Sequence, residues 1–221
     1  MLELKNIIKS YGSWEQKVTV LNWINLKVSE WEFVAIMWPS WSWKSTLMNI
    51  IWLLDNSDSG EYFIENQKID NLDESNLSTI RRKNIWFIFQ NYSLIPRMNV
   101  LEQVKLPLIY QWVKNSEAEK RSKDSLKKVG LEWKEKNLPN ELSWWQKQRI
   151  AIARALVISP KIMLADEPTW ALDSKTSDEI MNLLEELNRE WKTIILITHE
   201  KEVADRADRI IMVKDWNVMN I

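Results

Sequence analysis

The chain has 221 residues, a formal net charge of -1 and an isoelectric point of about 6.0. This length suits one globular domain with a sizeable core, and the charge balance excludes the basic field expected of a protein that binds nucleic acid or an anionic membrane surface. The chain lacks cysteine, which excludes disulfides and thiolate metal sites, and no apolar run approaches the roughly 18 residues of a membrane-spanning helix.

One pair of counts is abnormal: the chain has 3 glycines and 15 tryptophans. Glycine ordinarily makes up about 7% of a protein, which is close to what the two residues reach together. Several tryptophans stand at expected turns, such as Trp31 before a strand, Trp191 after a helix and Trp216 between Asp215 and Asn217. We therefore interpret the tryptophans as glycine positions, as when a UGA codon that the source organism reads as glycine is translated as tryptophan. A genuinely tryptophan-rich protein is the alternative.

The first third of the chain carries apolar residues in patterns typical of strands. We expect strands at Leu2–Ile8, Val18–Val28, Phe33–Met37 and Tyr62–Glu65, and a helix from about Lys44 to Leu54. Since strands continue to alternate with helices further along the chain, the pattern predicts an α/β fold with a largely parallel sheet.

The loop between the third of these strands and the helix reads WPSWSWKST. With glycine at Trp38 and Trp43 it fits G-x-x-x-x-G-K-[ST], in which backbone N–H groups and a helix N-terminus surround a phosphate chain. Lys44 would reach the outer phosphates and Ser45 would bind Mg²⁺. Indoles would fill the space of the phosphates, and a loop with a solvated lysine is the simpler interpretation. The predicted nucleotide-binding residues here are Trp38, Pro39, Ser40, Trp41, Ser42, Trp43, Lys44, Ser45 and Thr46.

The middle of the chain changes to a helical, charged pattern. A buried strand is expected at Ile85–Phe89, and Gln90 at its end is placed to contact Mg²⁺ or an attacking water. We expect a helical insertion over about residues 91–157, with core residues 1–90 and 158–221 on either side of it. The apolar start of this insertion suits either a docking surface or packing inside the insertion.

A second anion site is predicted within the insertion. Ser143 is a good N-cap for the helix that follows, in the sequence LSWWQ. With glycine at Trp144 and Trp145 the helix start becomes open, and its dipole favours a negative charge there, beside Gln146. An ordinary capped helix is the simpler interpretation.

The last third returns to strands, expected at Lys161–Ala165, Thr193–Thr198 and Arg209–Val213, with a helix at Ser174–Glu190. Polar residues follow the first two of these strands, at the edge where open α/β sheets bind ligands.

Three of those polar residues are candidates for chemistry. Asp166 is placed to hold Mg²⁺, and Glu167 to orient or deprotonate a water; a surface acidic pair is the simpler interpretation. His199, the one histidine, can hydrogen-bond a γ-phosphate, and it suits an ordinary surface or core position equally well.

These motifs, in this order, resemble those of the ATP-binding cassette (ABC) ATPases. WPSWSWKST is similar to the Walker A loop, LSWWQ to the signature, IMLADE to Walker B and ALD (Ala171–Asp173) to the D-loop. Gln90 and His199 match the Q-loop and switch positions, and Tyr11 stands where the family stacks an aromatic ring on adenine. The likeness spans essentially the whole chain. It departs from the family at glycine positions, where tryptophan stands at 38, 41, 43, 144, 145 and 170.

The resemblance implies a P-loop NTPase core of mostly parallel sheet, an N-terminal antiparallel β part and a helical insertion subdomain. It also implies a homodimer around two ATP molecules with Mg²⁺, in which Ser143 of one copy closes on the γ-phosphate held by the other. The implied catalytic residues are Lys44, Glu167 and His199, and the implied Mg²⁺ ligands are Ser45, Gln90 and Asp166.

Within the family the chain looks most like the subfamily of the exporter MacB and the lipoprotein-release ATPase LolD, with the cell-division ATPase FtsE as a close relative. This implies an integral-membrane permease partner, MacB-like or FtsX-like, and a place at the cytoplasmic face of the cell membrane through that partner. The alternatives are an FtsE-like role in cell division, a soluble cassette acting on DNA or ribosomes, and a non-catalytic cassette if the tryptophans are real.

Overall fold

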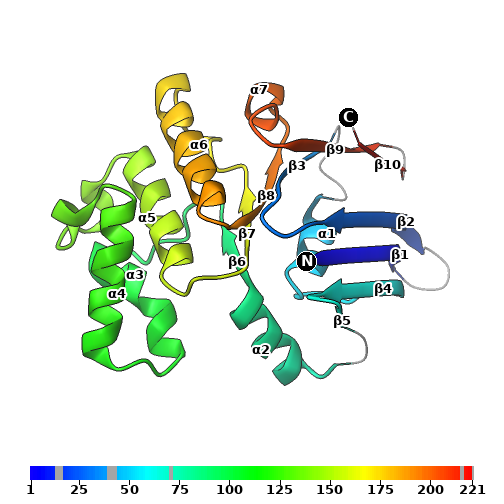
Figure 1. The fold of residues 1–221 in the computed structure, drawn as a ribbon, viewed down its shortest axis with the longest axis horizontal. Helices are drawn as coiled ribbons and strands as arrows, with labels where there is room; N and C mark the ends of the chain where they lie inside the picture. Colours follow the sequence, from blue (N-terminus) through cyan, green and yellow to red (C-terminus); the bar gives the residue numbers. More distant parts are fainter. Residues whose placement is uncertain (13–16, 39–43, 70–71, 215–216, 221) are drawn as a thin grey trace.

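The computed structural model describes residues 1–12, 17–38, 44–69, 72–214 and 217–220. It contains two β-sheets and a group of helices, and the helices and the smaller sheet lie on opposite sides of the larger sheet (Figure 1). The smaller sheet is antiparallel, with strand order β2-β1-β4-β5. Its strands are β1 (Leu2–Tyr11), β2 (Val18–Val28), β4 (Ser59–Ile64) and β5 (Gln67–Lys68).

The larger sheet has six strands in the order β10-β9-β3-β8-β7-β6, and only β10 runs antiparallel to its neighbour. Strands β3 and β8 are buried along almost their whole length because both faces of the sheet are covered, as parallel sheets require. The strands are β3 (Phe33–Met37), β6 (Ile85–Ile88), β7 (Ile162–Asp166), β8 (Thr193–Thr198), β9 (Arg209–Lys214) and β10 (Asn217–Asn220).

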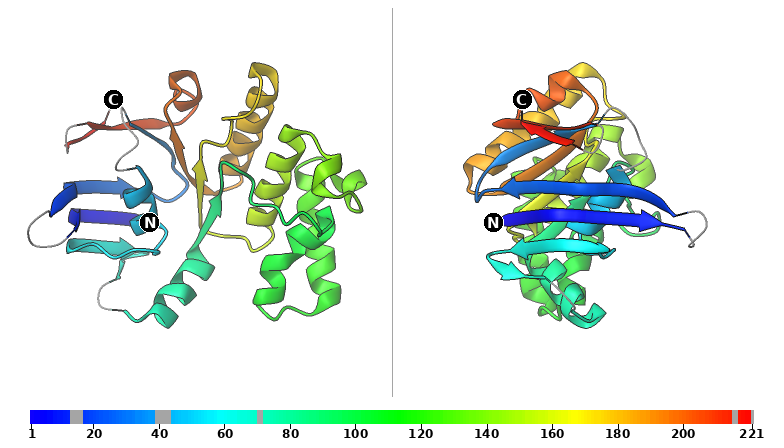
Figure 2. Two further views of the ribbon diagram at one scale, coloured as in Figure 1. Left: turned by 180° about the vertical axis from the view of Figure 1, so that it is seen from behind. Right: turned by 90° about the vertical axis from the view of Figure 1, so that its right-hand side faces the viewer.

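Helices α3, α4 and α5 gather at one end of the molecule, and the antiparallel sheet lies at the other (Figures 1 and 2). The helices are α1 (Lys44–Ile51), α2 (Glu74–Asn84), α3 (Val100–Tyr110), α4 (Asn115–Lys128), α5 (Trp144–Leu156), α6 (Ser174–Arg189) and α7 (Lys201–Ala204), with single 3-10 turns at Glu132–Lys134 and Pro139–Glu141.

Two hydrophobic cores lie on opposite faces of the parallel sheet. Successive residues of β3 point to opposite faces, so Phe33 packs in the core shared with α3, α4, α5 and α6, while Val34 packs in the core shared with the antiparallel sheet and α1. The parallel sheet therefore packs on both of its faces, against the helices on one face and against the antiparallel sheet and α1 on the other.

The α/β fold, the largely parallel sheet and the antiparallel N-terminal part are confirmed. The limits of three elements were wrong by three residues: β1 continues past Ile8 to Tyr11, β4 begins at Ser59 rather than Tyr62, and α1 ends at Ile51 rather than Leu54. Strands β6, β7 and β9 and helix α6 differ from the expected limits by one residue at one end or at both. Strand β10 pairs with β9 so that Asn217 faces Lys214, as a hairpin requires; Asp215 and Trp216 lie outside the described residues.

Helix α2 was not predicted. It is capped by Asp73, whose side chain accepts a hydrogen bond from the Asn76 backbone, but it buries only Leu77 fully. The apolar period that marks a helix in sequence is therefore absent. The division into a core and a helical subdomain over residues 91–157 stays a prediction. No helix in the described ranges is both long and apolar enough to cross a membrane.

Candidate active site

The carboxyl edge of the parallel sheet brings together residues that are distant in sequence. Strand β7 ends at Asp166 and is followed by Glu167, β8 is followed by His199, and Lys44 opens α1. Glu167 is only 3% exposed and has a left-handed backbone, with φ of 44°. Its backbone N–H donates to the carbonyl of Ile197 at 2.9 Å. Such a conformation in a non-glycine residue is strained, and it persists here because the neighbouring strand holds it.

Lys44 is the counter-ion of both acids. Its Nζ lies 2.6 Å from Asp166 Oδ1 and 3.3 Å from Glu167 Oε1, and its side chain is buried. Burial raises the pKa of Asp166, the Lys44 ammonium opposes that shift, and the charge of Glu167 adds to it. The cluster therefore holds two carboxylates against one cation, and each carboxylate needs Lys44 as long as no other cation is present.

The Glu167 carboxylate is held at both of its oxygens. His199 Nδ1 lies 2.7 Å from Oε1, and the Thr198 hydroxyl donates to Oε2 at 3.2 Å. These contacts fix the orientation of the carboxylate, which is what a group that must aim at a water molecule requires. Thr198 was missed in the sequence, although it is a polar residue that closes the otherwise apolar strand TIILIT.

The residues proposed for Mg²⁺ offer oxygen donors. Asp166 ends β7, Gln90 follows the adjacent strand β6, and Ser45 lies in the first turn of α1. One carboxylate with neutral oxygens fits Mg²⁺, which is commonly held by one or two carboxylates together with substrate phosphates. Within the described ranges no group of three His, Cys, Asp or Glu residues is arranged to hold a metal alone. The donors thus fit a metal that arrives with a phosphate ligand.

The predicted N-cap at Ser143 is confirmed. Its hydroxyl accepts a hydrogen bond from the Gln146 N–H at 3.4 Å, and the Gln146 side chain accepts one from the Ser143 N–H at 3.0 Å, which forms a capping box. Trp144 is exposed beside this helix start, and Trp145 packs on the Arg149 guanidinium. In this single chain the polar contacts described for Ser143 are with Gln146 of its own helix, not with the Lys44 cluster.

Other predicted nucleotide-binding residues have varied positions. Tyr11 ends β1, and Thr46 follows Ser45 in α1. Trp38 follows β3 and is buried, with an indole N–H that has no hydrogen-bond partner among the described residues. The loop residues Pro39, Ser40, Trp41, Ser42 and Trp43 lie outside the described residues.

A buried arginine holds the chain after Gln90. Tyr92 and Ser93 both have left-handed backbones, and Arg154 of α5 donates to the carbonyl oxygens of both at 2.6 Å. Arg154 is 6% exposed, and burial lowers its pKa to about 10. Arg154 was not predicted, and its signal in the sequence is a charge within the otherwise apolar run IAIARAL. Arg154 therefore ties the helix that begins at Ser143 to the turn that carries Gln90.

In the form of the chain that has glycine at all 15 tryptophan positions, replacing Arg154 with methionine is expected to destabilise the fold by about 3 kcal/mol and to slow the ATP hydrolysis that the motifs imply about tenfold. Two carbonyls would lose charged donors, and the strained turn after Gln90 would relax. Thermal unfolding and steady-state phosphate release measure the two effects. The matched control is Arg189→Met, because Arg189 is exposed at the end of α6. If the two variants were equally stable and equally active, Arg154 would not hold the turn after Gln90.

Four described tryptophans have left-handed backbones, a conformation that glycine adopts freely and bulky residues rarely do. They are Trp23, Trp31, Trp112 and Trp191, with φ of 56°, 63°, 58° and 66°. All four are exposed. Trp52 behaves differently, since its ring stacks on Phe87 at 4.8 Å, as an ordinary core tryptophan would. The left-handed backbone thus favours glycine at these four tryptophan positions, whereas the stacked ring of Trp52 fits a tryptophan.

Comparison with known proteins decides the family, because residues 21–170 match the ABC transporter family. The chain belongs to the ABC transporter family. This cassette is 47% identical to the ABC transporter ATP-binding protein YknY of Bacillus subtilis over 219 residues, which covers 99% of the chain and 95% of YknY. It is 42% identical to the macrolide export ATP-binding/permease protein MacB of Pasteurella multocida, covering 99% of the chain and 34% of MacB.

The fold of the cassette matches a solved structure of the same family. That structure is the dimeric, post-hydrolysis state of the ATP-binding cassette MJ0796 of Methanocaldococcus jannaschii, bound to ADP and Pi. It is 46% identical to the chain, with a TM-score of 0.89, and the match covers 100% of the chain and 98% of MJ0796. The cassette is thus a transporter ATPase of the MacB and LolD type, as its motifs predicted.

Proposed function

We propose that two copies of the cassette bind two ATP molecules between them, hydrolyse them, and so drive an integral-membrane permease of the MacB or FtsX kind. The observation that carries this proposal is the cluster of Lys44, Asp166, Glu167 and His199 at the carboxyl edge of the sheet. The known dimer of MJ0796, a cassette with the same fold, supports the two-copy arrangement.

Lys44 changes partners when ATP binds. In the structure its ammonium lies between the carboxylates of Asp166 and Glu167. The phosphates offer it a stronger, polyanionic partner at the start of α1, and Ser45, Gln90 and Asp166 would hold Mg²⁺, which neutralises phosphate charge when bound. The carboxylate of Glu167 is then released toward the attacking water, while Thr198 and His199 keep it oriented.

Hydrolysis needs a water aligned with the γ-phosphorus. Glu167 orients this water and takes its proton as the new oxygen–phosphorus bond forms and the bond to the β-phosphate oxygen breaks. His199 is half exposed beside Glu167, from which position it can donate a hydrogen bond to the γ-phosphate. The second copy closes the site with Ser143, Trp144, Trp145 and Gln146, whose helix start favours an anion.

Membrane coupling rests on the relatives. MacB of Pasteurella multocida is by its name both an ATP-binding protein and a permease, and the cassette matches about a third of it. We infer a permease partner for the cassette, which would hold it at the cytoplasmic face of the membrane. Copurification of the cassette with an integral-membrane protein tests this directly, and isolation with ribosomes or DNA instead would contradict it.

Replacing Lys44 with alanine is expected to weaken ATP binding about 100-fold, because several charge-assisted hydrogen bonds to phosphate disappear together. Binding is measured by fluorescence of a labelled ATP, in the form of the chain that has glycine at all 15 tryptophan positions, called the glycine form below. The control is Lys136→Ala, which removes an exposed lysine. Unchanged ATP affinity in Lys44→Ala would sink the phosphate role of this residue.

A further inference from the structure

The hydroxyl of Tyr11 reaches the segment that follows helix α1. It donates to Asp55 Oδ2 at 2.8 Å, and Asp55 lies in that segment. Tyr11 is 43% exposed, so its ring is accessible to a ligand while its far end is tethered.

Lys9 completes this arrangement from the same strand. Its Nζ donates to Asp55 Oδ1 and to the carbonyl of Asn56, both at 2.7 Å, and lies over the Tyr11 ring at 5.2 Å from the centroid. The Lys9 side chain is mostly buried, which makes this ion pair stronger than an exposed one. Because Lys9 covers one face of the ring, a flat ligand can stack only on the other.

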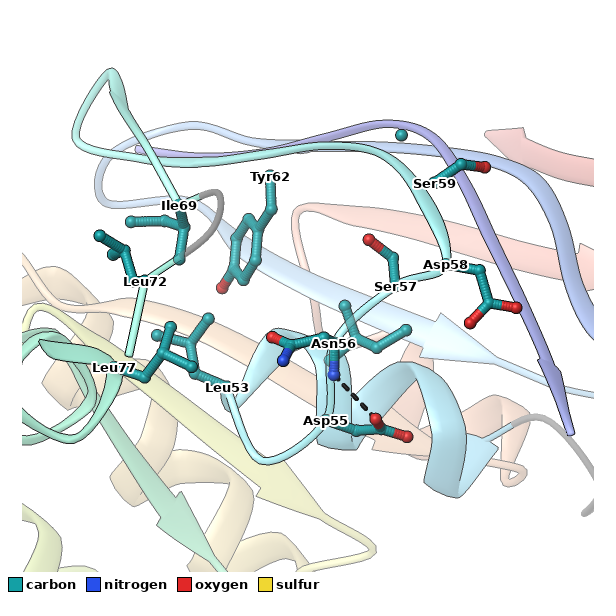
Figure 3. Close-up of a pocket in the computed structure, with 12 residues that line it drawn as sticks. Leu53, Asp55, Asn56, Ser57, Asp58, Ser59, Tyr62, Ile69, Leu72 and Leu77 are labelled. Carbon is teal, nitrogen blue, oxygen red and sulfur yellow. Dashed lines mark hydrogen bonds between the residues drawn. The ribbon is translucent and has the colours of Figure 1, made fainter. Parts of the chain in front are cut away.

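Both oxygens of Asp55 are therefore engaged. The backbone N–H of Asn56 donates to Oδ1 at 2.8 Å, which fixes the carboxylate from its own segment (Figure 3). Partial burial alone would raise the pKa of Asp55, but the hydrogen bonds from Lys9 and Tyr11 outweigh it and lower the pKa. The carboxylate is thus charged and immobile at neutral pH.

The segment that carries Asp55 borders a cavity of about 270 Å³ between α1, β4 and α2. Figure 3 shows Asp55 at the rim of this cavity, on the side away from Leu72 and Leu77. Tyr62 anchors the same region by donating from its hydroxyl to the carbonyl of Ile51 at 2.6 Å. The base of the Asp55 segment is therefore packed, and its carboxylate faces Tyr11 from a fixed position.

We propose that Asp55, together with Lys9, is a positioning residue that holds the Tyr11 ring ready to stack on the base of the bound nucleotide. The inference rests on a further part of the proposed function, the stacking of Tyr11 on adenine, which the family resemblance implies. A tyrosine at a strand end would otherwise lose side-chain freedom on binding, and fixing it beforehand removes that entropic cost.

The test compares a ligand that has a base with one that lacks it. ADP and inorganic pyrophosphate are titrated by calorimetry into the glycine form, with Mg²⁺ present, for the variants Asp55→Ala, Tyr11→Phe and Tyr11→Ala. Asp55→Ala and Tyr11→Phe should each weaken ADP binding about threefold to tenfold and leave pyrophosphate binding unchanged. The double variant, Asp55→Ala with Tyr11→Phe, should lose no more ADP affinity than either single variant, because both substitutions remove the same hydrogen bond between Tyr11 and Asp55.

The outcomes distinguish the role of Tyr11 in binding the base from the role of Asp55 in positioning Tyr11. If Tyr11→Ala leaves ADP affinity unchanged, Tyr11 does not bind the base and that part of the proposed function fails. If Tyr11→Ala weakens ADP binding but Asp55→Ala and Tyr11→Phe do not, the positioning role is overturned alone. Equal losses for ADP and pyrophosphate would also overturn it, since they indicate general damage to the site. The control is Glu61→Ala, which removes an exposed acid on β4 that pairs with Lys68.

Discussion

The glycine form with Glu167 replaced by glutamine is expected to hydrolyse ATP about 10²- to 10⁴-fold more slowly than the unaltered glycine form, while still binding ATP. Glutamine has nearly the same shape, so the Thr198 hydroxyl can still donate to its oxygen. It cannot take a proton from the attacking water. The ATP-bound pair of copies should therefore accumulate, and size-exclusion chromatography with ATP measures it as a shift from monomer to dimer.

The control for this prediction is Glu186→Gln, which changes an exposed acid on α6. It should turn over ATP normally and form no lasting dimer. Normal turnover in Glu167→Gln would show that another group activates the water. A slow enzyme without a trapped dimer would keep Glu167 as the general base and remove the link between hydrolysis and reopening.

Sequence alone predicts the carboxyl edge of the sheet well, for a simple physical reason. Parallel strands buried on both faces are largely apolar runs, as in β7 and β8, and the polar residues at the end of each run mark the edge. Glu167 and His199 are found in this way, and the structure places them 2.7 Å apart. The local pattern also finds Ser143, since capping needs only residues three apart.

What sequence could not supply is contact between distant segments. The strand continues past the expected end at Ile8 to Tyr11 because Tyr11 pairs with Val18 on β2. The tie from Arg154 to Tyr92, and that from Asp55 to Tyr11, join residues more than 40 positions apart. Such side chains resemble ordinary surface charges in sequence, and only the fold reveals their partners.

ATP binding by the cassette depends on whether tryptophan or glycine stands at the 15 tryptophan positions, so we expect a second large effect from this exchange. The chain with tryptophan at all 15 positions should bind ATP at least about 100-fold more weakly than the glycine form, because indoles at Trp38, Trp41 and Trp43 occupy the loop that must wrap the phosphates. Titration of both forms with labelled ATP measures the difference. Equal affinity would show that the phosphate loop tolerates the indoles.

The structure favours the glycine form on two independent grounds. Trp31 and Trp191 have left-handed backbones, a conformation that bulky residues rarely adopt, although their exposed rings contact each other edge to face, with centroids 5.0 Å apart. Trp38 is buried with an indole N–H that lacks a partner among the described residues, which costs free energy that glycine would not lose. The stacked ring of Trp52 argues the other way at its own position, and it lies outside the phosphate loop.

The mass of one peptide settles which form exists. Trypsin cuts after Lys27 and Lys44, and the peptide Val28–Lys44 from the natural protein contains Trp31, Trp38, Trp41 and Trp43 in the written sequence. We expect a mass corresponding to four glycines. The backbone argument applies to Trp31 and the phosphate argument to the other three. Fragment masses of a mixed peptide would locate each glycine and so separate the two arguments: glycine at 31 alone would leave the fold explained and the cassette inactive. Four tryptophans would make it a non-catalytic member of its family, in which the Lys44 cluster remains an internal ion pair and never meets a phosphate.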